Sequence, residues 1–154
     1  MLIIKIAVME RIVDVIEKNQ PQFNTISTST TVRDALYKMY CENVDYLIVN
    51  EENRFAGILT EHDITSKVLF SDKPLQNTVV QEFMTTAIPI VTADDSLEYA
   101  MQLLEHHNAR YLTVYDGFNF KAVISAQDLM RQALKKRNEI FGNLEDRQEH
   151  AWSY

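Results

Sequence analysis

The chain has 154 residues, of which 46% are hydrophobic and 24% charged, a balance typical of one folded domain and not of a disordered segment. Its net charge of −7 disfavours nucleic acid as a partner, because the molecule as a whole repels phosphate backbones. The single cysteine, Cys41, excludes an internal disulfide and a cysteine zinc cluster. It suits the reducing cytoplasm in which we expect the protein to reside.

The N-terminal region predicts an amphipathic helix. Its apolar residues Val8, Ile12, Val15 and Ile16 fall at helical spacing. Charged residues from Lys5 onward interrupt the apolar run and no small-residue cleavage site follows, so the segment does not match a signal peptide. No apolar run approaches the roughly 18 residues of a membrane span, and we expect no membrane partner. We assign residues 1–12 to an N-terminal helical segment that packs on the body.

From about residue 13 the chain repeats itself at a spacing of 65 residues without a gap. Identical pairs at this spacing include Ala35 with Ala100, Asn43 with Asn108, Tyr46 with Tyr111, Phe55 with Phe120 and Asp63 with Asp128. We place the first repeat at residues 13–73, the second at 74–138, and the connector at Ser71–Pro74. A repeat of about sixty residues buries too little surface to be comfortable alone, so we expect the two to share one core.

Each repeat begins with a short extended segment followed by a helix. Thr31 and Ser96 occupy the N-cap positions of the two helices, where a hydroxyl accepts a hydrogen bond from an unpaired backbone N–H. In the first repeat the apolar face of this helix comprises Val32, Ala35, Leu36, Met39 and Tyr40. Asn43 and Asn108 are expected to close the two helices.

A hairpin and a second helix complete each repeat. The expected strands are residues 46–49 and 55–59 in the first repeat and residues 111–115 and 120–124 in the second. They are rich in β-branched and aromatic residues, and turn-forming residues separate the members of each pair. A helix then begins at Thr60 or Ser125. The order of elements is β-α-β-β-α, twice, which predicts an α+β fold.

The last helix is expected to end near Arg137. This leaves residues 139–154 as a polar tail with four apolar residues, Ile140, Phe141, Trp152 and Tyr154. We interpret the tail as a dimer contact or a partner-docking segment. The basic run Lys135–Arg137 is interpreted as a solvated face near a helix end and not as a nucleic-acid patch.

The stretch from Thr60 to Asp63 recurs as Ser125 to Asp128, each time directly after an apolar strand. A hydroxyl followed three residues later by an acid forms a capping box at the start of a helix. The same corner suits a nucleotide, because a helix N-terminus attracts phosphate and a carboxylate matches two ribose hydroxyls. The small residue before each motif, Gly57 or Ala122, would let a flat ring approach the strand. Capping and nucleotide binding both remain open.

At this point the sequence resembles a known family. The repeated pattern of Gly or Ala, two apolar residues, Thr or Ser, two variable residues and Asp is similar to the signature of cystathionine β-synthase (CBS) domains. These domains occur in tandem pairs called Bateman modules. Three further stretches resemble the family: Val80–Thr85, Asp95–Ala100 and Asn108–Leu112. The resemblance covers roughly residues 13–138 and implies two repeats related by a pseudo-two-fold axis.

The resemblance also implies roles for particular residues in two clefts between the repeats. Asp63 and Asp128 would hold ribose hydroxyls, Thr60 and Ser125 would contact phosphate, adenine would lie against Thr25–Ile26 and Pro89–Ile90, and Arg110 would face phosphate. The counterpart of Arg110 at the repeat spacing is Asp45, which would repel phosphate. We therefore expect the two clefts to be inequivalent.

These observations favour a stand-alone regulatory module that senses AMP, ADP or ATP, forms a homodimer and controls a separate partner protein. Two alternatives remain: a ligand-free scaffold for dimerisation or partner docking, and a binder of S-adenosylmethionine or NAD. No spacing suggests a catalytic group, and three glycines leave no room for a glycine-rich phosphate loop, so we expect no enzyme and no required cofactor. His62 and the adjacent His106 and His107 lack metal-ligand spacing, so no metal site is expected.

Overall fold

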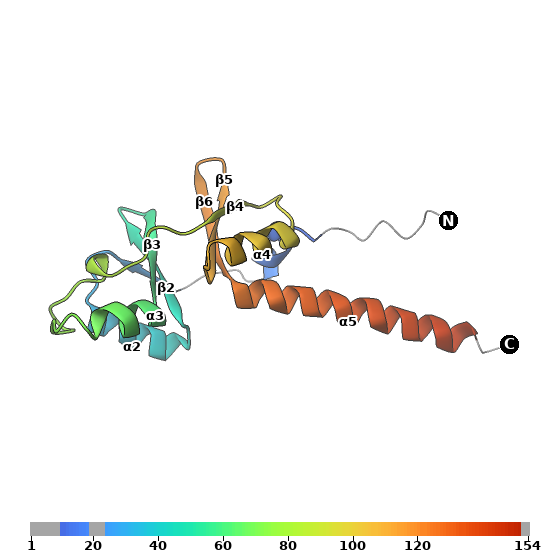
Figure 1. The fold of residues 1–154 in the computed structure, drawn as a ribbon, viewed down its shortest axis with the longest axis horizontal. Helices are drawn as coiled ribbons and strands as arrows, with labels where there is room; N and C mark the ends of the chain where they lie inside the picture. Colours follow the sequence, from blue (N-terminus) through green and yellow to red (C-terminus); the bar gives the residue numbers. More distant parts are fainter. Residues whose placement is uncertain (1–9, 19–23, 152–154) are drawn as a thin grey trace.

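The computed structural model describes residues 10–18 and 24–151, with the backbone alone for residues 17–18 and 143–151. Figure 1 shows two similar halves side by side and one long helix that runs away from them. Val8, expected on the first helix, lies outside the described residues. No helix in the described part of the chain is long and apolar enough to cross a membrane.

The predicted order of elements is confirmed in both halves. The first half comprises β1 (Thr25–Ser27), α2 (Val32–Glu42), β2 (Tyr46–Glu51), β3 (Arg54–Thr60) and α3 (Glu61–Asp63), which continues into a π-helical turn (Ile64–Val68). The second half comprises a 3₁₀ turn (Val80–Glu82), β4 (Ile90–Thr92), α4 (Leu97–His106), β5 (Tyr111–Asp116), β6 (Asn119–Ser125) and α5 (Ala126–Ala151). A short helix, α1 (Ile12–Lys18), precedes both. The fold is α+β with two β-α-β-β-α repeats.

Each repeat forms one three-stranded mixed sheet. β1 is parallel to β2, β2 is antiparallel to β3, and the order β4-β5-β6 repeats this arrangement. The registers are equivalent: Thr25 lies opposite Ile48, and Ile90 lies opposite Thr113. The predicted hairpins are therefore confirmed, and in each repeat the parallel strand begins at the end of the sheet where the second helix starts.

The helix caps follow the prediction, and one apolar assignment does not. The Thr31 and Ser96 hydroxyls each accept a hydrogen bond from a backbone N–H three residues on, at 3.1 Å. Asn43 ends α2 in the left-handed region, with φ 51°. Tyr40 was expected to face the core and is 83% exposed, because α2 buries a narrower face.

The expectation of one shared core is confirmed only in part. Each repeat has its own hydrophobic cluster, and a third, smaller cluster joins buried residues of both repeats, namely Ile48, Ile58 and Val123. The two repeats exchange the segments that close the two main clusters. Ile12 of α1 is fully buried in the core of the second repeat, and its N–H donates to the Asp95 carbonyl at 3.0 Å. Val80 is fully buried in the core of the first repeat, and its N–H donates to the Thr30 carbonyl at 2.9 Å. The exchange ties the repeats together, while each repeat keeps its own main core.

The two sheets meet through pairs of equivalent residues. The rings of Tyr46 and Tyr111 lie 4.9 Å apart, and those of Phe55 and Phe120 stack at 4.3 Å with an angle of 9° between their planes. Both pairs are related by the repeat spacing, so each residue packs on its own counterpart, as residues do near a two-fold axis. The pseudo-two-fold axis therefore runs through this small aromatic interface.

The C-terminal helix is longer than expected. Residues 139–151 were expected to belong to a tail, but α5 continues through them to Ala151. The segment has no proline, and its one helix-weakening residue, Gly142, costs only about 1 kcal/mol relative to alanine. Arg137 lies 5.5 Å from the centre of the Phe141 ring one turn later, which supports the helix at this point. The polar composition of residues 139–151 therefore did not mean that the helix ends before them.

Candidate functional site

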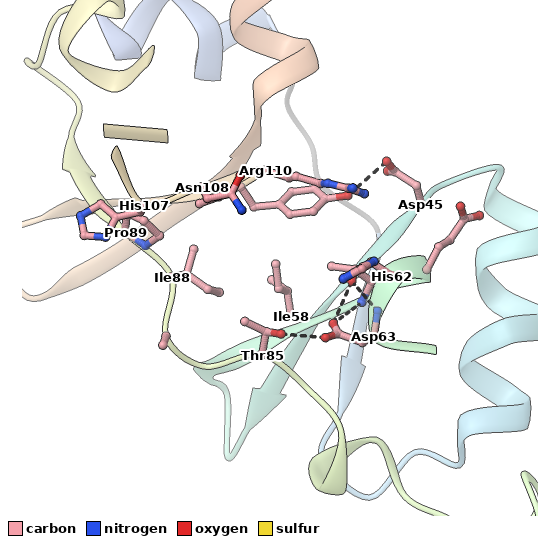
Figure 2. Close-up of a pocket in the computed structure, with 15 residues that line it drawn as sticks. Asp45, Ile58, His62, Asp63, Thr85, Ile88, Pro89, His107, Asn108 and Arg110 are labelled. Atoms are coloured by element: carbon pink, nitrogen blue, oxygen red, sulfur yellow. Dashed lines mark hydrogen bonds between the residues drawn. The ribbon is translucent and has the colours of Figure 1, made fainter. Parts of the chain in front are cut away.

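A cavity of about 500 Å³ lies where the two repeats meet. One wall comes from the first repeat, with Ile58 of β3 and the corner from Thr60 to Asp63. The other comes from the second repeat, with Pro89 before β4 and the loop from His107 to Tyr111. Figure 2 shows Asp63 and Thr85 on one side and Arg110, Asn108 and Pro89 on the other. The volume is within the usual range for small-molecule sites.

The Thr60 corner forms a complete capping box at the start of α3. The Thr60 hydroxyl accepts from the Asp63 N–H at 3.0 Å. Asp63 Oδ2 in return accepts from the Thr60 N–H at 2.9 Å and from the Thr60 hydroxyl at 2.8 Å. Asp63 is 2% exposed, so these hydrogen bonds hold a buried carboxylate in one orientation.

The second oxygen of Asp63 is also occupied. Oδ1 accepts from the Lys67 ammonium at 2.6 Å and from the Thr85 hydroxyl at 2.8 Å. Lys67 compensates the buried negative charge, and Thr85 links α3 to the segment that leads into the second repeat. Both contacts were missed from the sequence. The four-residue spacing of Asp63 and Lys67 is an ion-pair signal that would have found the first.

Gly57 serves a different purpose from the one expected. A Cβ atom on this residue would lie 2.6 Å from the Thr85 carbonyl oxygen, far closer than van der Waals contact. The backbones of Ile58 and Thr85 form a two-way bridge beside it, at 3.0 and 2.7 Å. The missing side chain therefore makes room for the Thr85 segment. The prediction that a flat ring approaches the strand at this point is replaced by a contact within the protein.

Asp45 shares the cavity with Arg110, which corrects the expectation that the two face different clefts. The Tyr111 hydroxyl donates to Asp45 Oδ2 at 3.1 Å and holds the carboxylate beside the second repeat (Figure 2). Burial, together with the Asp45 carboxylate, raises the pKa of Tyr111. Glu61 also lines the cavity at the start of α3. The wall around Arg110 is thus acidic as well as basic.

A family model described as CBS domain matches residues 10–69 and 80–135. The chain belongs to the CBS-domain family. The matched ranges contain both repeats and both capping boxes, so the molecule is a CBS pair.

Relatives and solved structures agree with this assignment. The CBS domain-containing protein YhcV of Bacillus subtilis is 32% identical over 108 residues, which are 70% of this chain and 76% of the relative. The mitochondrial protein CBSX3 of Arabidopsis thaliana is 29% identical over 118 residues, and the match spans 57% of its length. The crystal structure of the CBS domain NE2398 superimposes with a TM-score of 0.75 at 28% identity, over 82% of this chain and 99% of that one. A structure of CBSX2 in complex with AMP gives a TM-score of 0.67 at 25% identity, covering 82% and 98%.

The second CBS motif forms the same capping box but has different surroundings. Asp128 Oδ2 accepts from the Ser125 N–H and hydroxyl, both at 2.9 Å. Its side chain is 19% exposed and lies 3.5 Å from Arg131. At the position equivalent to Lys67, Gln132 donates instead to Glu10 at 3.0 Å. The two CBS motifs therefore differ in how their carboxylates are compensated.

Of the residues implied by the family resemblance, four line the cavity: Thr60, Asp63, Pro89 and Arg110. Ser125, Asp128, Thr25, Ile26 and Ile90 do not line it. The part of the chain equivalent to Thr85–Ile88 in the other cleft is residues 20–23, which lie outside the described residues. Asp128 is close enough to Tyr46 to add to the effect of burial, which raises the pKa of Tyr46 to about 12.

The sequence interpretation treated Thr25 and Pro89 as equivalent adenine-facing positions, and this is wrong by one residue. The Pro89 carbonyl accepts from Thr113 at 2.9 Å, and the Asn24 carbonyl accepts from Ile48 at 2.8 Å. Asn24, and not Thr25, is therefore the equivalent of Pro89. Ile90, the next residue, is 59% exposed.

Among the described residues no group of three or more His, Cys, Asp or Glu side chains is arranged to hold a metal ion. The cavity instead combines hydroxyl, carboxylate, guanidinium and apolar groups. These are the groups that recognise a polar organic molecule with an apolar ring.

Proposed function

We propose that this CBS pair is a regulatory module that binds an adenosine nucleotide in the cavity between its repeats. One observation carries the proposal: the Thr60–Asp63 corner of the first repeat faces Pro89 and Arg110 of the second across a single cavity. The complex of CBSX2 with AMP supports it, because that protein has the same fold and 25% identity. The proposal assigns no catalytic role to the pair.

The chemistry of each wall fits one part of the nucleotide. Adenine fits the apolar side, against Ile58, Ile88 and Pro89. The ribose hydroxyls fit the Asp63 carboxylate, where they would replace the Thr85 hydroxyl on Oδ1. Phosphate fits Arg110, whose guanidinium offers positive charge and several N–H donors.

A ligand in this position would contact both repeats at once. It would therefore favour the relative arrangement of repeats in which all its contacts are made, and the equilibrium between arrangements would shift by the difference in affinity. We propose that a partner protein, or a second copy of the chain in a homodimer, responds to this shift. The cytoplasmic location stays a prediction.

A ligand-free docking scaffold is the competing function, and one observation favours it. Asp63 already accepts four hydrogen bonds inside the protein, as a purely structural capping box would. A nucleotide must exchange at least one of them. The two functions therefore differ in a measurable way, because only the sensor gains stability from a ligand.

A thermal-unfolding panel with AMP, ADP, ATP, NAD and S-adenosylmethionine at millimolar concentration tests the proposal. A ligand at 100 times its dissociation constant should stabilise the fold by roughly 2.7 kcal/mol. A shift with NAD or S-adenosylmethionine alone would reassign the ligand. No shift with any of the five would contradict the sensor and leave the scaffold.

A further inference from the structure

The side chains that line the cavity carry more negative than positive charge. Asp45, Glu61 and Asp63 carry carboxylates on its walls, and Arg110 carries the one guanidinium. Lys67 lies behind Asp63 and is paired with it at 2.6 Å. With Asp63 paired to Lys67, the remaining charged groups on the cavity walls are Arg110 and the two carboxylates of Asp45 and Glu61.

His62 and His107 are the other titratable groups on the cavity walls. Figure 2 places His62 next to Asp63 and His107 beside Pro89, at the other end of the cavity from Asp45. Neither imidazole carries a permanent positive charge, so Arg110 is the one permanently charged cation among the cavity-lining residues.

The two unmatched acids flank the place where phosphate fits. The Glu61 N–H donates to the Asp45 carbonyl at 3.0 Å, so these residues adjoin at the start of α3. The Tyr111 hydroxyl, at 3.1 Å, fixes the Asp45 carboxylate on the same side of the cavity as Arg110. A chain of phosphates that extends past Arg110 would approach these carboxylates.

We propose that the cavity selects its adenosine ligand by charge: it binds a nucleoside or a nucleoside monophosphate more tightly than a di- or triphosphate. Asp45 is the specificity-determining residue. The inference rests on the proposed function and goes beyond it, because nucleotide binding alone does not set an order among AMP, ADP and ATP.

The physical basis is the charge that each further phosphate brings. A monophosphate meets the Arg110 guanidinium, the one permanent cation on the cavity walls. Each additional phosphate adds at least one negative charge and meets carboxylates in place of a cation. At contact distance in a water-exposed site, one such repulsion weakens binding by about fivefold.

The test is a calorimetric titration with adenosine, AMP, ADP and ATP, without magnesium, at low and high salt. Three proteins are compared: the unchanged chain, Asp45→Asn and Asp34→Asn. The asparagine at position 45 keeps an oxygen that accepts from Tyr111. Asp34 is exposed on α2 and its substitution changes the net charge equally, so it is the matched control. Unfolding curves without ligand check that all three proteins fold.

We expect affinity to fall from AMP to ADP to ATP in the unchanged chain and in the control, and the differences to shrink at high salt. Asp45→Asn should reduce the ratio of AMP to ATP affinity by about fivefold. If Asp45→Asn fails to fold, Glu61→Gln should reduce the ratio in the same direction. ATP binding as tightly as AMP in the unchanged chain, or a ratio unaffected by the substitution, would overturn the inference while leaving nucleotide binding intact. No binding of any of the four would refute the proposed function itself.

Discussion

At the scale of single residues, the two equivalent acids have unequal structural roles. Asp63 is buried and accepts hydrogen bonds from Thr60, Lys67 and Thr85, whereas Asp128 is partly exposed and has Arg131 at 3.5 Å. The sequence duplicates the motif faithfully, and the difference arises from what packs against it. The first carboxylate therefore serves both the helix cap and the connection between repeats.

Alanine at the two acids should reveal this inequality. Asp128→Ala removes the acid of a capping box and should cost about 1 kcal/mol. Asp63→Ala removes the acid of a capping box and also leaves Lys67 and Thr85 without this acceptor, and should cost about 2–3 kcal/mol. Urea unfolding of the two variants measures both values, each variant being the control for the other. Equal losses would mean that the Lys67 and Thr85 contacts contribute nothing to stability.

The candidate site could be predicted in part from single residues. Thr60, Asp63, Pro89 and Arg110 were identified by a local motif and a family resemblance, and they share one cavity. Asp45 was assigned to the other cleft, because repeat symmetry alone says nothing of the Tyr111 hydroxyl that draws it across. A local sequence motif gives no information on contacts between segments that are distant in the sequence.

At the scale of elements, the exchanged segments are the feature that organises the fold. α1 comes before the first strand of the first repeat but closes the core of the second. The Val80 turn comes before the first strand of the second repeat but closes the core of the first. The strands, hairpins and caps could be predicted because their signals are local and occur twice. The exchange could not, because an apolar face in the sequence does not specify which core buries it.

Alanine at the two exchanged residues should therefore weaken the opposite repeat. Ile12→Ala removes a fully buried side chain and should cost on the order of 2–5 kcal/mol. Hydrogen exchange should accelerate mainly in β4–β6 and α4, whereas Val80→Ala, the counterpart, should accelerate it in β1–β3 and α2. Faster exchange in the repeat adjacent in sequence to each substitution would contradict the exchanged arrangement.

At the scale of the whole molecule, the repeats form two cores joined by exchanged segments and by an aromatic interface on the pseudo-two-fold axis. Tyr46 and Tyr111 lie at this interface, and the cavity opens beside it. A ligand that contacts both repeats would act on a contact surface that is small compared with either core. Regulation by a change in the relative arrangement of repeats fits this construction.

The interface also predicts how stability depends on pH. Burial raises the pKa of Tyr46 to about 12, above the value near 10 of an unfolded chain. A raised pKa means that the folded state keeps the proton longer, so the contribution is complete below pH 10 and is lost as the pH rises toward 12. Unfolding free energy should fall by up to about 2–3 kcal/mol across that interval.

Urea unfolding at a series of pH values, followed with tyrosinate absorbance, measures this dependence. Tyr46→Phe should reduce it, whereas Tyr40→Phe, at a position 83% exposed, should leave it unchanged. A pH dependence that is the same in both variants would show that the buried ring does not couple ionisation to folding.

The central claim is that an adenosine nucleotide binds between the repeats with its ribose on Asp63. A crystal structure of the protein grown with AMP tests it most directly. We expect AMP in the cavity, with ribose hydroxyls within hydrogen-bond distance of the Asp63 carboxylate and the Thr85 hydroxyl displaced from it. An unoccupied cavity with the contact between Asp63 and Thr85 intact at millimolar AMP, or AMP bound elsewhere, would contradict the account.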